Sequence, residues 1–160
     1  FDFKTVPDVP INATAIGGTQ NSSRDKLFVA TGSVVKGYNR YGKQFLDFQT
    51  NKTEPITSMA ICDLEMVLCD SYTLNHFHDC TSANAYTCEE RINDVACLPV
   101  KWGRPMVIII ACNDYSLRVV HDSMPKYKTM AGGIPYTLLV AGHHEDGNAH
   151  HCTFSTLDVL

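Results

Sequence analysis

Histidine and cysteine side chains gather in two short stretches of the sequence that could bind a metal ion. In the first, His76-Phe-His-Asp-Cys80, the side chains of His76, His78 and Cys80 would share one face of an extended strand. The second stretch contains His143, His144, His150, His151 and Cys152. Neutral imidazole and thiolate are good zinc ligands. Zinc binding is therefore the first chemistry that these residue types suggest.

The spacing within both stretches favours an interpretation without a metal. Neither has Cys-x-x-Cys or His-Glu-x-x-His spacing, and successive same-face residues on a strand lie about 7 Å apart, which is awkward for a tetrahedral site. We interpret residues 76–80 as a strand that runs into an exposed turn, and residues 143–152 as a polar loop. A loop can wrap around an ion, so a zinc site in the 143–152 tract is kept as the alternative hypothesis.

The sequence predicts no catalytic residue and no cofactor. The glycine pairs at 17–18 and 132–133 lack the strand–loop–helix frame of a phosphate-binding loop, and there is no Gly-x-Ser-x-Gly nucleophile elbow. Asp63 and Glu65 are neighbouring carboxylates that we interpret as solvated turn charges. We therefore expect a protein that is not an enzyme.

Lys36, Arg40, Lys43 and Trp102 are the candidates for binding a partner or a lipid surface. The three basic residues, with Lys52 beyond them, follow one predicted hairpin on a chain whose formal net charge is −4. Such a basic stripe could face anionic lipid headgroups, although basic side chains also protect exposed sheet edges. Trp102 stands in a proline-flanked loop, where an exposed indole could anchor a partner or pack against the fold.

Short strands must position all of these residues, because turn-forming residues interrupt the sequence at the intervals typical of an all-β chain. β-Branched and aromatic runs alternate with Gly, Asn, Asp and Pro, and no helical periodicity lasts beyond two turns. A strand–turn–strand pattern occurs at 26–39, at 65–78 and at 108–120. Each copy has a further apolar strand and an aromatic outer strand beside it. Four strands in about forty residues are typical of one blade of a β-propeller.

This period predicts a single partial propeller of four-stranded blades over residues 1–160. The predicted blades span 11–50, 54–90, 92–131 and, incompletely, 133–160. Closed rings carry about four to eight blades and the sequence begins with Phe1, so we expect about half of a propeller from a longer protein. A sandwich or barrel of about twelve strands is the alternative on pattern alone.

The composition is that of a folded globular domain. Of the 160 residues, 44% are hydrophobic and 19% are charged, which argues against disorder of the whole chain. With 13 basic and 17 acidic residues, the chain lacks the excess of basic residues typical of nucleic-acid-binding proteins. The longest apolar run, 106–112, is too short to span a bilayer.

Seven cysteines with no recognisable secretory segment favour a reducing compartment, with several of the cysteines acting as small core residues. The sequons at Asn12, Asn21 and Asn51 leave a glycosylated secreted β-domain as a third possibility.

Long segments, in the same order, resemble the Bardet-Biedl syndrome protein 7 family, whose members are subunits of the BBSome. The similar segments are 42–54, 71–80, 92–100 and 111–120. The resemblance covers about residues 25–130, whereas the histidine-rich segment 142–152 departs from the family's pattern. That departure leaves open whether the last blade is complete.

The resemblance implies a non-enzymatic interaction scaffold. In this family a propeller belongs to a coat-like complex that carries membrane proteins to and from cilia, with a small Arf-like GTPase and the intraflagellar transport machinery. It implies other BBSome subunits as partners, ciliary membrane proteins as cargo and a peripheral membrane contact. It also implies a role in cilium assembly, with the protein in the cytoplasm, at the ciliary basal body and at the ciliary membrane.

Overall fold

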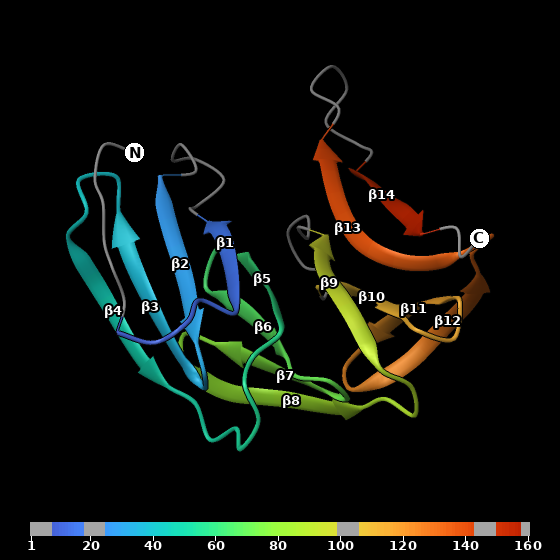
Figure 1. Cartoon of the computed structure of the whole chain (residues 1–160), viewed down its shortest axis with the longest axis horizontal. Coiled ribbons are helices and arrows are strands. Elements are labelled where there is room, and N and C mark those ends of the chain that lie inside the picture. Colours follow the sequence, from blue (N-terminus) through green and yellow to red (C-terminus); the bar gives the residue numbers. More distant parts are fainter. Residues whose placement is uncertain (1–7, 18–24, 99–105, 143–149, 158–160) are drawn as a thin grey trace.

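The strands of the chain form a series of antiparallel sheets. A computed structural model describes residues 8–17, 25–98, 106–142 and 150–157. Within these ranges every regular element is a β-strand, and the strands form three four-stranded sheets and one two-stranded sheet (Figure 1). None of the elements described is a helix able to cross a membrane. The prediction of an all-β chain built from four-stranded blades is confirmed.

Each four-stranded sheet is a meander, because its strands pair in chain order. Blade 1 contains β1 (Ala13–Gly17), β2 (Lys26–Thr31), β3 (Val34–Asn39) and β4 (Gln44–Gln49). Blade 2 contains β5 (Ser58–Cys62), β6 (Glu65–Cys69), β7 (Thr73–His78) and β8 (Thr81–Thr87). Blade 3 contains β9 (Ile92–Leu98), β10 (Val107–Cys112), β11 (Ser116–His121) and β12 (Met124–Met130). The two-stranded sheet pairs β13 (Ile134–Gly142) with β14 (His150–Leu157).

The sheets stack as blades around a common centre. The innermost strands β1, β5, β9 and β13 follow one another, and each contacts the next in the series (Figure 1). β12 lies at the outer edge of its sheet, and all seven of its residues are exposed. This arrangement is a partial propeller, as the period of the sequence predicts.

Alternation along the middle strands supplies both faces of each blade. In β6, Met66, Val67 and Leu68 are buried in succession. Because neighbouring side chains of a strand point to opposite faces, Met66 and Leu68 join the core shared with blade 1, while Val67 joins the core shared with blade 3. A strand covered on both sides therefore reads as a continuous apolar run.

Two apolar cores hold the three blades together. The core between blades 1 and 2 comprises Phe28, Ala30, Val35, Ile56, Met59, Met66, Leu68 and Phe77. The core between blades 2 and 3 comprises Val67, Cys69, Leu74, Cys88, Ile92, Val95, Cys97, Ile108, Ile110, Cys112 and Val120. The predicted core role of several cysteines is confirmed, since Cys69 and Cys112 are fully buried. The structure describes the side chains of six cysteines, and all six are free thiols.

Gly37 lets β4 pack closely on β3, and an alanine there should be destabilising. An added Cβ would lie 2.7 Å from Phe45 Cζ and 2.9 Å from Leu46 Cβ. We expect Gly37→Ala to lower the free energy of unfolding by about 1–3 kcal/mol through overpacking, as measured by urea denaturation. Gly132→Ala is the matched control, because a Cβ there meets nothing within 4 Å. Equal losses in the two variants would contradict this account of Gly37.

Candidate interaction sites

The two histidines of β7 hold a carboxylate of β6. His76 Nε2 lies 2.6 Å from Glu65 Oε2, and His78 Nδ1 lies 2.7 Å from Glu65 Oε1. Burial opposes ionisation of Glu65, but the hydrogen bonds from the histidines outweigh burial and hold the pKa of this carboxyl below its ordinary value. The pair of imidazoles is therefore engaged in a structural contact between neighbouring strands.

Cys80 does not join these histidines on one strand face. It follows Asp79 in the β7–β8 turn, and both residues have positive φ, 45° for Asp79 and 61° for Cys80. Two consecutive left-handed residues form the tight hairpin turn that matches the twist of the flanking strands. Across the part of the chain that the structure describes, no group of three or more His, Cys, Asp or Glu side chains is placed to hold a metal ion.

The second histidine-rich stretch is only partly described. His143 and His144 lie outside the described residues. His150, His151 and Cys152 belong to β14, where their backbones pair with Gly142, Ala141 and Val140 of β13. These three residues are therefore not in a loop, because the β-branched and aromatic run that follows them draws them into a strand. Zinc binding by this tract stays a prediction.

Three of the four basic residues lie on the β3–β4 hairpin. Lys36 is directly opposite Asp47 of β4. At the turn, the guanidinium of Arg40 lies 4.6 Å from the centre of the Tyr41 ring and donates a hydrogen bond to the Tyr41 hydroxyl, while Lys43 is exposed. Trp102, the other predicted binding residue, lies outside the described residues.

Lys52 does not extend this basic stripe. Its Nζ lies 2.6 Å from Asp70 Oδ2, and the two side chains are 5% and 7% exposed. Asp70 Oδ1 also accepts hydrogen bonds from the backbone N–H groups of Tyr72 and Thr73, at 2.9 and 2.7 Å. Burial alone would raise the pKa of Asp70, but the hydrogen bonds from Lys52 and from the turn lower it to about 2. The Lys52 side chain thus anchors the segment after β4 to the β6–β7 turn.

A second carboxylate, partly buried, occupies the corresponding turn of blade 3. Asp114 Oδ2 accepts hydrogen bonds from Arg118 Nη2 at 2.9 Å and from Lys128 Nζ at 2.8 Å. Arg118 is buried, and its Nη1 reaches the Tyr86 hydroxyl of blade 2 at 3.4 Å. Burial opposes ionisation of Asp114, but hydrogen bonds from Lys128, Ser116 and Arg118 hold its pKa well below the ordinary value. This network therefore connects blades 2 and 3.

Sequence reasoning missed both carboxylates as ion-pair centres. A partial signal was present, because an Asp two or three residues before a Ser or Thr is typical of a turn in which the side chain caps backbone N–H groups. The two lysine partners were not predictable from local pattern, since Lys52 is 18 residues from Asp70 and Lys128 is 14 residues from Asp114.

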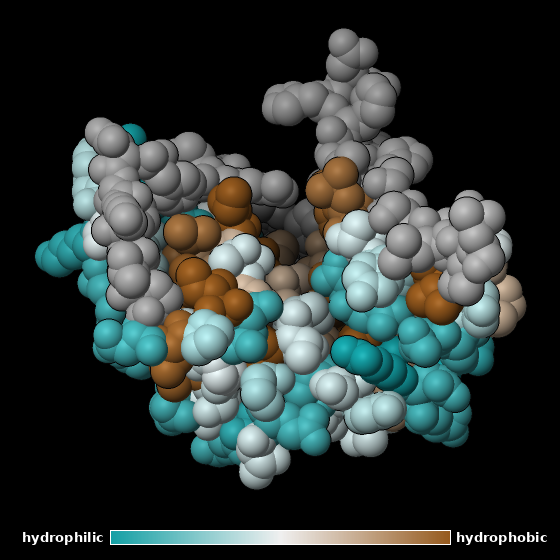
Figure 2. All heavy atoms as spheres, viewed as in Figure 1, coloured by the Kyte–Doolittle hydropathy of each residue, from teal (hydrophilic) through white to brown (hydrophobic). Residues whose placement is uncertain are grey.

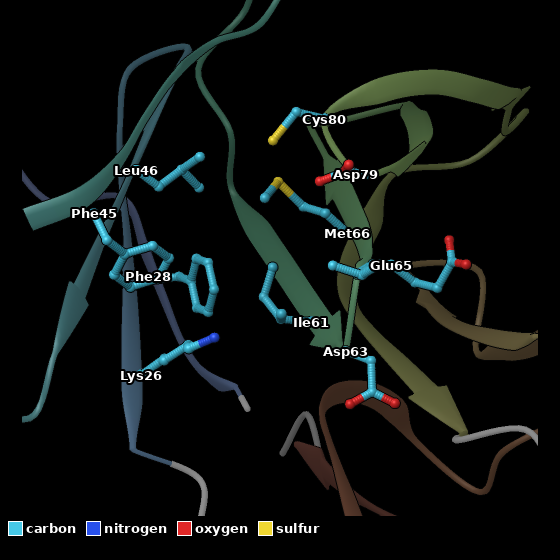
Figure 3. Close-up of a pocket in the computed structure, with 11 residues that line it drawn as sticks. Lys26, Phe28, Phe45, Leu46, Ile61, Asp63, Glu65, Met66, Asp79 and Cys80 are labelled. Atoms are coloured by element: carbon cyan, nitrogen blue, oxygen red, sulfur yellow. The ribbon is translucent and has the colours of Figure 1, made fainter. Parts of the chain in front are cut away.

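A pocket of about 130 Å³ opens between blades 1 and 2 (Figure 3). Its walls are Lys26, Phe28, Phe45, Leu46, Ile61, Asp63, Leu64, Glu65, Met66, Asp79 and Cys80. Most of the side chains that face its interior are apolar, and the charged residues come from the strand ends and turns. Such a concave site accepts an apolar group.

Exposed apolar side chains also mark blade 1 and the segment before it. Val9, Ile11 and Ile16 are each about half exposed, at 52%, 49% and 55%. Figure 2 shows hydrophobic side chains gathered over blade 1 on the face of the molecule that it presents. These exposed apolar side chains, the pocket and the β3–β4 hairpin make blade 1 the candidate surface for binding other molecules.

Known proteins resemble this chain in sequence and in fold. A family profile described as the BBS7 β-propeller matches residues 1–159. The BBSome complex member BBS7 of Mus musculus is 40% identical over 145 residues, and bbs-7 of Caenorhabditis elegans is 34% identical over 140 residues. These alignments cover 91% and 85% of this chain but 20% and 19% of the relatives. The chain therefore spans about one fifth of the length of the curated relatives that it matches.

Two solved structures of BBS1N in complex with ARL6DN have a similar fold. Their TM-scores are 0.61 and 0.63 at 10% sequence identity. The alignments cover 81% and 84% of this chain and 43% and 44% of those chains. At this level of identity the likeness concerns the propeller fold.

Proposed function

Because the chain belongs to the BBS7 β-propeller family, we propose that it acts without enzymatic activity, as a propeller scaffold that binds other subunits of a BBSome-type complex. The family match over residues 1–159 is the observation that carries this proposal. The fold supports it, because stacked blades present loops, edges and inter-blade pockets to several partners at once.

The scaffold serves cilia in this proposal. Its partners are the other BBSome subunits, its cargo consists of ciliary membrane proteins, and it supports cilium assembly and the traffic of those proteins. It works in the cytoplasm, at the ciliary basal body and, peripherally, at the ciliary membrane. The names of the mouse and nematode relatives as BBSome members support this assignment, and the BBS1 propeller in complex with ARL6 supports protein binding as a use of the fold.

Assembly size is the first test of the scaffold proposal. In size-exclusion chromatography of a ciliated-cell lysate, we expect the full-length protein to elute with a large complex. The complex should elute at the same volume in high-salt buffer at neutral pH, because salt screens exposed charges but does not weaken apolar contacts. Elution of the whole population as a monomer would overturn the proposal.

The basic hairpin is proposed as a contact for anionic lipid or for an acidic partner surface. Lys36, Arg40 and Lys43 would contribute about 1 kcal/mol each near an anionic membrane, and Trp102 is proposed as a further anchor. Flotation of the protein with phosphatidylserine vesicles should fall when Arg40 and Lys43 are both changed to glutamate. Unchanged flotation would remove lipid as the ligand of this hairpin.

Zinc binding is the alternative function, through His143, His144, His150, His151 and Cys152. Three of these residues, His150, His151 and Cys152, belong to one strand, β14. Elemental analysis of the purified protein decides the matter, before and after the double change His150→Ala and Cys152→Ala. One equivalent of zinc lost in the variant would support the alternative, and zinc near zero in the unmodified protein would end it.

A further inference from the structure

The pocket between blades 1 and 2 has two apolar walls from different blades. Figure 3 shows Phe28, Phe45 and Leu46 of blade 1 on one side, facing Ile61 and Met66 of blade 2 on the other. The Phe28 and Phe45 rings meet edge to face, with their centres 5.7 Å apart. Because the walls rest on buried strands, with Phe28 6% and Met66 5% exposed, the pocket is formed by the fold before any ligand arrives.

The size of the pocket suits one aliphatic side chain. Its volume of about 130 Å³ is close to that of an apolar protein cavity of about 150 Å³ that binds benzene. Four carbons of a leucine side chain need a similar space. Phe45 and Leu64 stand at the opening and are 47% and 56% exposed. These two side chains would close over the stem of a bound residue and remove further apolar surface from water.

The charges around the pocket select the residues next to that side chain. Asp63 and Asp79, in the β5–β6 and β7–β8 turns, are both exposed. The third carboxylate of the walls, Glu65, points away from the pocket in Figure 3 and is held by His76 and His78. The ammonium of Lys26 lies 5.4 Å from the centre of the Phe45 ring. Asp79 therefore places a carboxylate beside the apolar interior, and this charge complements a basic residue on the ligand.

We propose that this pocket binds a leucine-like side chain of a partner protein, on a segment that carries a lysine or arginine beside it. The proposal rests on the proposed scaffold function, because it gives that scaffold a specific place to hold a partner segment. An extended segment suits it, since one apolar side chain then enters the pocket while an adjoining basic side chain reaches Asp79 in the β7–β8 turn.

Photo-cross-linking of a short peptide to the full-length protein tests the pocket. The probe is the peptide Gly-Lys-Leu-Arg-Gly with photo-leucine, a diazirine analogue, at its centre. At millimolar concentration we expect cross-links to residues 45–46, 61–66 or 79–80, mapped by mass spectrometry. In competition with this probe, the parent peptide should be at least tenfold stronger than the same peptide with alanine in place of leucine, because the alanine side chain fills little of the pocket.

Leu64→Lys is the variant that tests the location of binding. Leu64 is exposed in a turn, so a lysine there should fold, and it places a positive charge that repels the basic peptide at the opening of the pocket. We expect at least a fivefold loss of cross-linking. Met124→Lys is the matched control, because Met124 is 60% exposed on β12 of blade 3, and this variant should cross-link like the unmodified protein.

Cross-links that map elsewhere, or that persist unchanged in Leu64→Lys, would overturn the pocket proposal. So would a glutamate-flanked peptide that competes as well as the basic one, because the carboxylate of Asp79 would then have no role in selection. Size-exclusion elution of the same proteins reports separately on the scaffold. A monomeric full-length protein overturns the scaffold function whatever the peptide does, and absent cross-links in an assembled complex overturn only the pocket.

Discussion

Replacing Asp70 by asparagine should lower the free energy of unfolding of blade 2 by about 3–5 kcal/mol. Asparagine keeps an oxygen that can accept from the N–H groups of Tyr72 and Thr73, so the turn retains its capping atom. It removes the negative charge beside Lys52, whose side chain is 5% exposed and lies 2.6 Å from the carboxylate. The cost comes from a buried ammonium that has lost its counter-ion.

The variant Lys52→Met separates the contribution of the ion pair from that of the hydrogen bonds in the turn. Lys52→Met should cost less than Asp70→Asn, because the carboxylate still accepts from Tyr72 N, Thr73 N and Thr73 Oγ1. The double variant should recover part of the loss, since neither buried charge is then unpaired. Hydrogen–deuterium exchange of the peptide spanning residues 66–78 in the full-length protein measures the loss. Equal and additive losses in the two single variants would contradict a coupled pair.

Acid should weaken the same turn. The pKa of Asp70 is about 2 in the folded chain and about 3.9 in an unfolded one. A carboxyl whose pKa is lowered by folding stabilises the fold above its unfolded pKa, and that contribution disappears as pH falls through the folded value. We therefore expect the protection factors of residues 66–78, taken relative to the intrinsic exchange rate at each pH, to fall between about pH 4 and pH 2, with a smaller fall in Asp70→Asn.

Asp114→Asn should produce the second large effect, about 3 kcal/mol. The Arg118 side chain, 7% exposed, would keep only neutral partners, Ser116 Oγ at 3.3 Å and the Tyr86 hydroxyl at 3.4 Å. Because Tyr86 belongs to blade 2, faster hydrogen exchange should reach β8 as well as β11.

Lys128→Met is the control for Asp114. The Lys128 side chain is 50% exposed, and an exposed ion pair contributes about 0–1 kcal/mol. A loss in Lys128→Met as large as that in Asp114→Asn would show that the exposed pair, and not the buried guanidinium, sets the stability of this turn. Exchange confined to β11 in Asp114→Asn would contradict the link between blades 2 and 3.

The strands were predictable because burial on one or both faces leaves a period in the sequence. The runs around Met66–Leu68 and Ile108–Ala111 are continuous because neighbouring blades cover both of their faces. The family assignment was also available from sequence, because similar segments recur in the same order along the chain, and the family match confirms it.

Contacts between distant residues were not predictable in the same way. The sequence places Lys52 in a surface stripe because it is charged and close to Lys43, whereas its burial depends on Asp70 in the next blade. The pocket has the same origin, since Phe45 and Ile61 meet only when blades 1 and 2 stack. No local pattern encodes a surface built by two blades.

The most direct test of the central claim is the stoichiometry of the proteins that co-purify with the tagged full-length chain from ciliated cells. Quantitative mass spectrometry should recover the other BBSome subunits in near-equal amounts, and Leu64→Lys and Met124→Lys should retain them if the pocket binds a peripheral partner segment. Recovery of the tagged chain without those subunits would contradict the scaffold account.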